Sequence, residues 1–395
     1  MNKTILNIDI QEFISKNVNS NIHSLILKGS AFEGVETKEL IEQIEAKKKC
    51  ELKLNTWFQI PNIYYPNKLN IEQTSSETTA LIKSNLIGGH SLLDLTGGFG
   101  VDSYYFSKKF KTVTHCETNP KLAEIATHNF NVLKADNVTT QCVDGLEFLK
   151  STTEKFDWIY IDPSRRDTEK NKKFLIEDCR PNITMHQSLI FNNSKNVLIK
   201  MSPMLDISSA LQTLKYVSKV YIIAVKNEVK ELLFFQEKNN KTEATIHTIN
   251  SHPSSTEHFS FTASQEKSAE TTFSTPQRFL YEPNAAVMKS GAFRLISEHF
   301  KLNKLDLNTH LYTSNRVIEN FPGKIYEISS TLPYQKKTLK RLIGGQKANL
   351  KTRNFPEKTD TIKKYFKITD GGKNYLFFTS SLGHKIAIQC LLSEQ

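Results

Sequence analysis

The sequence predicts an α/β protein built on a doubly wound, mostly parallel sheet. Short apolar segments alternate with helical patterns through residues 78–249, which favours strands joined by crossover helices. One such segment, residues 91–94, runs into a glycine-rich turn at residues 97–100, and a helical pattern covers residues 101–110. A second apolar segment, residues 112–116, ends at Glu117. Ligands of open α/β sheets bind where the strands end, so this order predicts a cofactor site at that edge.

The residues of the glycine-rich turn indicate which kind of cofactor fits. Gly98 and Gly100 let the backbone approach a ligand closely, and the helix N-terminus beyond them is electropositive. The dinucleotide fingerprint is incomplete, because Ser103 stands where its third glycine would be. Asp94, at the end of the first strand, would repel a pyrophosphate. The sulfonium and ammonium of S-adenosylmethionine (SAM) would be attracted instead, and the acid of Glu117 suits a ribose diol.

Residues 94–100 resemble motif I of the class I SAM-dependent methyltransferases, with Thr96 where the first glycine usually stands. The resemblance implies that Glu117 holds the ribose hydroxyls. It also implies that Asp144, which follows the strand-like residues 138–143, contacts the adenine.

The helix before the first strand adds candidates at the other end of the cofactor. Thr74 and Glu77 have the spacing of a capping box, so we expect a helix to begin after them and to run over residues 78–86. In class I methyltransferases this helix often lines the methionine end of SAM. The residues implied there are Glu72, Gln73, Ser75 and Ser76.

Residues 162–166, Asp-Pro-Ser-Arg-Arg, follow a further apolar strand and resemble motif IV, the catalytic loop of these enzymes. The resemblance implies that Asp162 is the catalytic or amine-polarising residue, and that Pro163 is a second catalytic candidate whose carbonyl would polarise the amine. Arg165 is the expected substrate-positioning residue, and Arg166 is a further substrate candidate.

Lys200 and Ser202 end the fifth predicted strand beside this loop and are also substrate candidates. Pyrimidine C5 methylation needs a thiolate nucleophile, and it is disfavoured because Ser164 and Ser202 occupy the neighbourhoods of the usual cysteines. Exocyclic amine methylation usually has an aromatic residue in the loop to stack the flipped base, and that residue is missing. Ring-nitrogen and ribose methylation stay open.

Composition and charge narrow the class of protein. The chain has 395 residues, 38% hydrophobic and 24% charged, which is typical of a soluble globular protein. No apolar run reaches the ~20 residues of a membrane span, and the N-terminus does not resemble a signal peptide. Five scattered cysteines without a Cys-x-x-Cys pair favour reduced thiols and a cytoplasmic location. No metal site is expected among the 11 histidines.

The net charge of +11 is concentrated at one end of the chain. Residues 324–395 contain 14 Lys and Arg against 5 Asp and Glu. A basic module of this kind predicts a polyanionic partner. Lys347, Lys351 and Arg353, in a glycine-bounded loop, are the expected phosphate contacts.

Over nearly its full length the chain resembles the THUMP-like domain-containing class I methyltransferases. Five segments carry this resemblance: residues 72–77, 94–102, 162–166, 281–286 and 348–355. It implies a Rossmann-like, seven-stranded methyltransferase core at residues 67–262 after a helical N-terminal element at residues 1–66. A small ferredoxin-like module at residues 277–323 and a basic THUMP-like α+β domain at residues 324–395 follow. It also makes Asp102 a cofactor candidate.

THUMP modules bind RNA in enzymes that modify tRNA and rRNA, so the resemblance implies an RNA base as the substrate. Two alternatives stay open. A methyltransferase of a small molecule or a protein would keep the same SAM site and would not need the basic tail. A catalytically inert RNA-binding protein would keep the tail, but the retained acids and glycines of the two motifs disfavour it.

Overall fold

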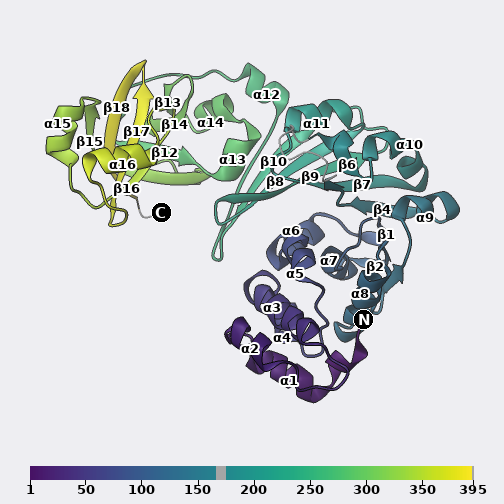
Figure 1. Ribbon diagram of the computed structural model, residues 1–395. Helices are drawn as coiled ribbons and strands as arrows, with labels where there is room; N and C mark the ends of the chain where they lie inside the picture. Colours follow the sequence, from purple (N-terminus) through teal and green to yellow (C-terminus); the bar gives the residue numbers. More distant parts are fainter. Residues whose placement is uncertain (166–174, 394–395) are drawn as a thin grey trace. The chain divides into compact units, whose positions relative to one another are not determined.

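The computed structural model describes residues 1–165 and 175–393 (Figure 1). The chain divides into two compact units, of which the first comprises Met1–Ser218 and Glu231–Thr242 and the second comprises Lys219–Lys230 and Glu243–Gln395. The four domain ranges expected from the sequence stay a prediction. Arg166 lies outside the described residues. No helix in the described part of the chain is both long and apolar enough to cross a membrane.

Helices form the N-terminal part of the first unit. They are η1 Lys3–Leu6, α1 Ile8–Lys16, α2 Ile22–Lys28, α3 Thr37–Lys53, α4 Asn55–Gln59, α5 Lys68–Gln73 and α6 Glu77–Leu86. Apolar residues at helical spacing, such as Leu40 and Ile44 of α3, are buried. They join one apolar cluster with residues of α7 (Val101–Ser107) and α8 (Pro120–Val132). In that cluster the ring of Trp57 lies edge-on to Tyr104, with ring centroids 4.8 Å apart.

A nine-stranded sheet carries the predicted cofactor site, in the order β11-β10-β8-β9-β7-β4-β1-β2-β3. Its strands are β1 Gly89–Asp94, β2 Phe110–Cys116, β3 Val138–Gln141, β4 Phe156–Ile161, β7 Ser194–Met201, β8 Val217–Val225, β9 Glu228–Glu237, β10 Thr245–Ser251 and β11 Thr256–Thr262. Because β1 pairs in parallel with β2 and β4, and β4 pairs in parallel with β7, the carboxyl ends of these strands meet at one edge. The predicted α/β class is confirmed.

Shorter elements connect the strands of this sheet. They are α9 Gly145–Ser151, β5 Ser164–Arg165, η2 Ile176–Asp178, β6 Cys179–Arg180, α10 Ile183–Asn193 and α11 Ile207–Thr213. Figure 1 shows α6 and α7 on one face of the sheet and α10 on the other. Both faces are therefore covered, as a doubly wound fold requires.

The sheet differs from the expected one at its antiparallel strand. Residues 219–225 and 244–249 lack a long crossover between them, which predicts an antiparallel final pair of a seven-stranded sheet, but these strands, β8 and β10, pair in parallel. The antiparallel strand is β9, which pairs with β7. Six consecutive residues of β9, from Glu231 to Gln236, are buried. The strand therefore lacks the polar–apolar alternation by which half-buried strands are found.

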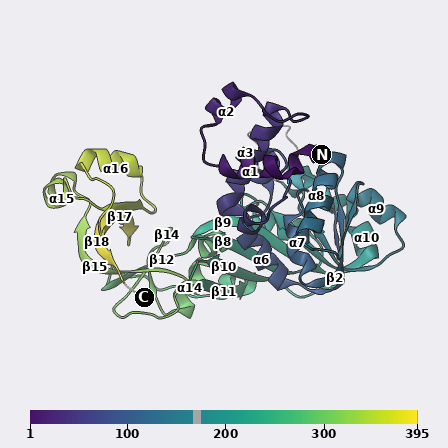
Figure 2. The same ribbon diagram turned by 90° about the horizontal axis from the view of Figure 1, so that it is seen from below.

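The second unit contains a separate seven-stranded sheet, ordered β13-β14-β12-β15-β18-β17-β16. Its strands are β12 Phe279–Pro283, β13 Asn303–Asp306, β14 Thr309–Ser314, β15 Gly323–Pro333, β16 Asn349–Thr352, β17 Asn374–Ser381 and β18 His384–Leu392. The helices of this unit are α12 Ala263–Ser268, α13 Ala285–Ser290, α14 Phe293–His299, α15 Lys336–Ile343 and α16 Thr359–Phe366. The basic, helical pattern of residues 336–342 predicts a helix, and the structure confirms it as α15, which lies beside α16 (Figure 2).

Candidate cofactor and catalytic site

Asp94 ends β1 and is almost fully buried. Its Oδ1 accepts a hydrogen bond from the Thr96 backbone N–H at 3.0 Å, and its Oδ2 accepts one from the Ser103 hydroxyl at 2.6 Å. Burial raises the pKa of the Asp94 carboxyl to about 7, although the two hydrogen bonds oppose this shift. The side chain is thus held between its neutral and charged forms near neutral pH.

His115 of β2 orients Ser103 from the other side. Its Nδ1 lies 2.9 Å from the Ser103 hydroxyl oxygen, and burial lowers the pKa of the imidazole to about 4, so the ring is neutral. Because Ser103 has one proton and donates it to the ionised Asp94, Nδ1 carries the imidazole hydrogen in this arrangement. The ring supports the loop without adding a positive charge next to Asp94.

Gly97 leaves room for that ring. A Cβ atom at this position would lie 2.2 Å from Cε1 of the fully buried His115. We therefore expect Gly97→Ala to lower the free energy of unfolding by about 1–3 kcal/mol or more, because a packed ring must move. Urea denaturation measures the loss. Gly88→Ala is the control, since its new methyl would come no nearer than 3.3 Å to Lys109 O. Equal stability of the two variants would contradict this account.

The rest of the loop holds Glu117 in place. Gly98, with φ +59°, donates its N–H to Glu117 Oε2 at 2.9 Å, and the Asn119 N–H donates to Oε1 at 2.7 Å. Gly100, with φ +88°, is the left-handed N-cap residue of α7, and a Cβ there would lie 2.5 Å from the Phe130 ring. Two backbone donors thus fix a carboxylate at the end of β2, which can still accept bonds from a diol.

Asp144 lies at the N-terminus of α9. Its Oδ1 accepts hydrogen bonds from the N–H groups of Leu146 at 2.8 Å and Glu147 at 3.3 Å, so the side chain caps the helix. The residue is exposed. Its role toward adenine stays a prediction, while its capping role is explicit in the structure.

The predicted methionine end of the site is built around Asp102. Its Oδ2 accepts hydrogen bonds from the Ser75 hydroxyl and from the Tyr160 hydroxyl, each at 2.8 Å. Ser76 is the N-cap of α6 and accepts a bond from the Thr79 N–H at 3.2 Å. Gln73 is exposed at the end of α5. Of these cofactor candidates, Ser75 and Asp102 are in direct contact.

The expected capping box is wrong, although α6 begins at Glu77, within one residue of the expected start. Glu77 bonds elsewhere: its carboxylate accepts from the Thr56 backbone N–H at 2.9 Å and from the Thr56 hydroxyl. Ser76, not Thr74, caps the helix. A nearby side chain of α4 therefore competes successfully for the carboxylate that the local pattern assigned to the cap.

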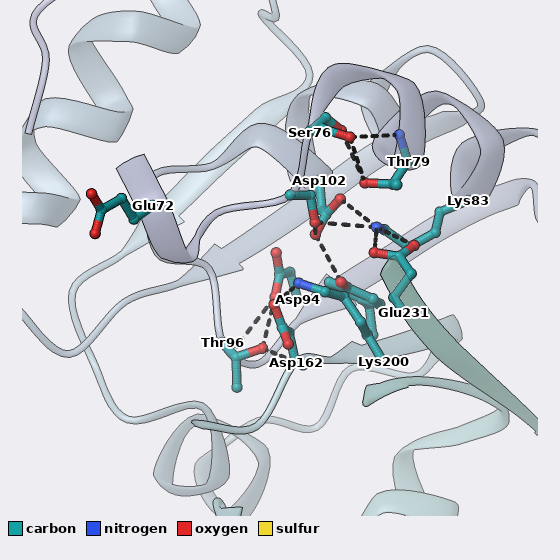
Figure 3. Close-up of polar contacts among 12 residues, drawn as sticks. Glu72, Ser76, Thr79, Lys83, Asp94, Thr96, Asp102, Asp162, Lys200 and Glu231 are labelled. Carbon is teal, nitrogen blue, oxygen red and sulfur yellow. Dashed lines mark hydrogen bonds and ion pairs between the residues drawn. The ribbon is translucent and has the colours of Figure 1, made fainter. Parts of the chain in front are cut away.

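The N-terminal helices hold the segment before α6 from both sides. Lys53 of α3 donates to the carbonyl oxygens of Ile71 at 2.8 Å and Glu72 at 2.7 Å, which lie in the last turn of α5. Lys49 pairs with the Glu72 carboxylate. Glu72 therefore points away from the buried acids (Figure 3). Ser75 and Ser76 therefore lie between two anchored points of the chain, residues 71–72 on one side and Glu77, which binds Thr56, on the other.

The motif IV loop meets the motif I loop at Asp162. The Asp162 N–H donates to the Thr96 hydroxyl at 2.7 Å, and the Asp162 carboxylate pairs with the Lys200 ammonium (Figure 3). Burial alone would lower the pKa of Lys200, but the carboxylates of Asp162, Asp102 and Glu231 outweigh it and raise that pKa. Lys200 is therefore a charged partner of Asp162.

The remaining candidates lie near this pair. Pro163 is buried directly after Asp162, and Arg165 belongs to β5, which pairs with β6. Ser202 accepts a hydrogen bond from the Met204 N–H at 3.2 Å in the turn after β7. The catalytic roles of Pro163 and Arg165 and the substrate role of Ser202 stay predictions.

A buried charge network lies behind these residues, and the sequence reasoning missed two of its members. Lys83 of α6 is fully buried and contacts both carboxylate oxygens of Glu231 at 2.8 Å and Asp102 Oδ1 at 3.2 Å. Burial raises the pKa of Glu231, and Lys83 opposes this shift. Burial also disfavours the Asp102 charge, but Lys83 and Lys200 outweigh it and lower that pKa.

In the second unit, Glu282 of β12 forms ion pairs with two of the residues predicted to contact RNA. Its Oε1 accepts from Arg353 at 2.8 Å, and its Oε2 pairs with Lys351 and accepts from the Tyr326 hydroxyl at 2.9 Å. Glu282 is buried. Lys347, the third predicted contact, lies in the loop before β16, with its side chain against Gly371. The structure therefore gives Lys351 and Arg353 a partner within the fold.

Known protein families and solved structures resemble this chain in sequence and in fold. Residues 279–322 match a ferredoxin-like domain family, and residues 323–391 match a THUMP domain-like family. A solved structure of a Porphyromonas gingivalis W83 protein described as a "putative methyltransferase" is 29% identical to this chain. Its TM-score is 0.89, and the match covers 99% of both chains. The chain therefore carries a ferredoxin-like and a THUMP-like domain, and along its whole length it shares the fold of a protein described as a methyltransferase.

A curated relative gives a second, shorter match. An uncharacterized RNA methyltransferase from Mycoplasma mobile (strain ATCC 43663 / 163K / NCTC 11711) is 30% identical over 149 residues, which is 36% of this chain. The chain spans 40% of that relative's length.

Proposed function

We propose that this protein is a methyltransferase that transfers a methyl group from SAM to a base of a structured RNA, in tRNA or rRNA. The observation that carries the proposal is the contact of the motif I and motif IV loops through Thr96, Asp162 and Lys200. That contact puts the Asp162 carboxylate beside the motif I loop, which would hold the sulfonium of SAM. The Mycoplasma relative and the THUMP-like domain support RNA as the substrate class.

The residues present fit SAM. Gly97 and Gly100 lack Cβ atoms because the rings of His115 and Phe130 occupy that space, and Gly98 donates its N–H to Glu117. Asp94 and Glu117 are acids suited to a cationic, diol-bearing ligand. Bound SAM would supply the activated methyl group. Glu117 would hold the ribose, with Asp144 at the adenine and Ser75, Ser76 and Gln73 at the methionine end.

In this mechanism Asp162 accepts a hydrogen bond from the attacking group and orients it. Lys200 pairs with the Asp162 carboxylate and fixes its direction, because the Lys200 ammonium is itself held by the buried acids. Pro163 rigidifies the loop that follows. These residues position the acceptor and stabilise positive charge that develops on it.

Methyl transfer to RNA tests the proposal directly. Total RNA from a strain lacking the protein is incubated with the purified chain and methyl-labelled SAM, and nucleosides are analysed by mass spectrometry. We expect label in one nucleoside. No label in RNA, with SAM bound normally, would refute RNA as the substrate and favour a small molecule or a protein.

The pH dependence of SAM binding tests the role of Asp94. With its pKa raised to about 7, this carboxyl is mostly neutral at pH 6 and mostly charged at pH 8. A charged carboxylate attracts the SAM cation, so affinity should rise with pH, by up to about tenfold across that range. Calorimetry at several pH values measures it. The ratio of wild-type to Asp94→Asn affinity removes the titration of SAM itself, and a pH-independent ratio would contradict the assignment.

A further inference from the structure

We propose that the exposed side of α15 binds the phosphate backbone of the substrate RNA, an inference that rests on the proposed function and assigns its contact surface. Four cations of α15 stand at helical positions i, i+1, i+4 and i+5, which lie on one side of a helix. They form the α15 cationic face: Lys336, Lys337, Lys340 and Arg341. Leu339 and Ile343 of the same helix are buried in the domain core.

Two of these cations, Lys336 and Lys337, oppose the stability of the helix, whereas Lys340 and Arg341 lie in its last turn, where the dipole favours them. The first turn of α15 contains two lysines and no acid, although a helix N-terminus favours negative charge. Cations four positions apart, such as Lys336 and Lys340, also repel each other. A bound polyanion would offset both the unfavourable interaction of the first-turn lysines with the helix dipole and the repulsion between the cations.

Tyr365 of α16 holds two of these cations side by side. The ammonium groups of Lys336 and Lys340 lie 5.2 and 5.3 Å from the centroid of its ring, which is 40% exposed. Lys336 also pairs with Glu357 at 3.1 Å. In the described part of the chain, Lys337, Lys340 and Arg341 have no ion-pair partner. Their charges are therefore available, unlike those of Lys351 and Arg353.

RNA is the partner that this chemistry fits best. Unpaired cations supply phosphate contacts, and a half-exposed aromatic ring among them is typical of surfaces that bind single-stranded nucleic acid. Residues 324–395, which contain the face, also carry most of the excess positive charge of the chain. The loops and single-stranded segments of a structured RNA present the required phosphates.

The salt dependence of RNA binding tests the surface. The full-length triple variant Lys337→Gln/Lys340→Gln/Arg341→Gln is compared with a charge-matched control, Lys267→Gln/Lys301→Gln/Lys373→Gln, whose residues are exposed elsewhere in the second unit. Binding of total tRNA is measured by fluorescence anisotropy from 50 to 300 mM salt. Each lost phosphate contact should reduce the slope of log K against log salt by about 0.7–0.9. We expect the triple variant to lose about 2 in slope and about tenfold or more in affinity at low salt.

The control should bind like the wild type, and unchanged thermal unfolding should show that both variants are folded. A triple variant with the wild-type slope would overturn the proposed surface, as would a wild-type chain that does not bind RNA. The labelling experiment separates the two proposals. RNA methylation by the wild type together with an unchanged slope in the triple variant refutes the α15 face alone, and absence of any RNA methylation refutes the proposed function.

Discussion

Asp162→Asn is expected to lower kcat for methyl transfer by about 10²–10⁴-fold, the usual contribution of a positioned proton acceptor. The amide has nearly the same shape, so the bond from the residue 162 N–H to Thr96 can persist. It removes the charge that pairs with Lys200 and that would stabilise a positively charged acceptor. Initial-rate kinetics on the labelled RNA substrate measure kcat.

SAM affinity distinguishes this effect from a damaged cofactor site. Calorimetry should give the same SAM dissociation constant for Asp162→Asn and the wild type within about threefold, because that residue would face the acceptor. Asp136→Asn, an exposed acid after α8, is the matched control and should leave both quantities unchanged. Full activity of Asp162→Asn would rule out the proposed role of this carboxylate.

Lys83→Met is expected to cost about 3–5 kcal/mol in the free energy of unfolding, because it leaves buried carboxylates without their cation. Lys83 contacts Glu231 at 2.8 Å and Asp102 at 3.2 Å, and its side chain is fully buried. Urea denaturation followed by circular dichroism measures the loss.

The double variant Lys83→Met/Glu231→Met should recover much of that stability, since apolar residues of similar size can replace a buried ion pair at little cost. Lys150→Met provides the exposed counterpart: its 2.6 Å pair with Glu147 is at the surface, and its loss should cost at most about 0.5 kcal/mol. A double variant as unstable as Lys83→Met would show that Glu231 does not carry the effect.

Local patterns predicted the first half of the sheet well. The run from Asp94 through Gly98 and Gly100 to Glu117 is contiguous in sequence, and its strand–turn–helix–strand order is confirmed. Glycines with positive φ and acids at strand ends leave signals within a few residues. For that reason the sequence alone predicts the α/β class and the approximate position of the site.

The contacts that support the site leave no such local signal. Lys83 and Glu231 are separated by 148 positions, and neither belongs to a motif. The partner of Lys351 and Arg353 is likewise about 70 residues away, at Glu282, so a basic loop looked like a free phosphate-binding surface. Sequence spacing identified which side chains are charged, but pairing depends on the tertiary fold.

The shared apolar cluster of the N-terminal helices and α7–α8 bears on how the first unit opens. Trp57 packs against Tyr104, and Asn129 of α8 exchanges two 2.9 Å hydrogen bonds with the backbone of Tyr64. Segments joined in this way are expected to unfold as one cooperative foldon. Backbone amides in α3 and α7 should therefore exchange with deuterium at a common rate, and a ligand at the glycine-rich turn should slow exchange as far away as α3.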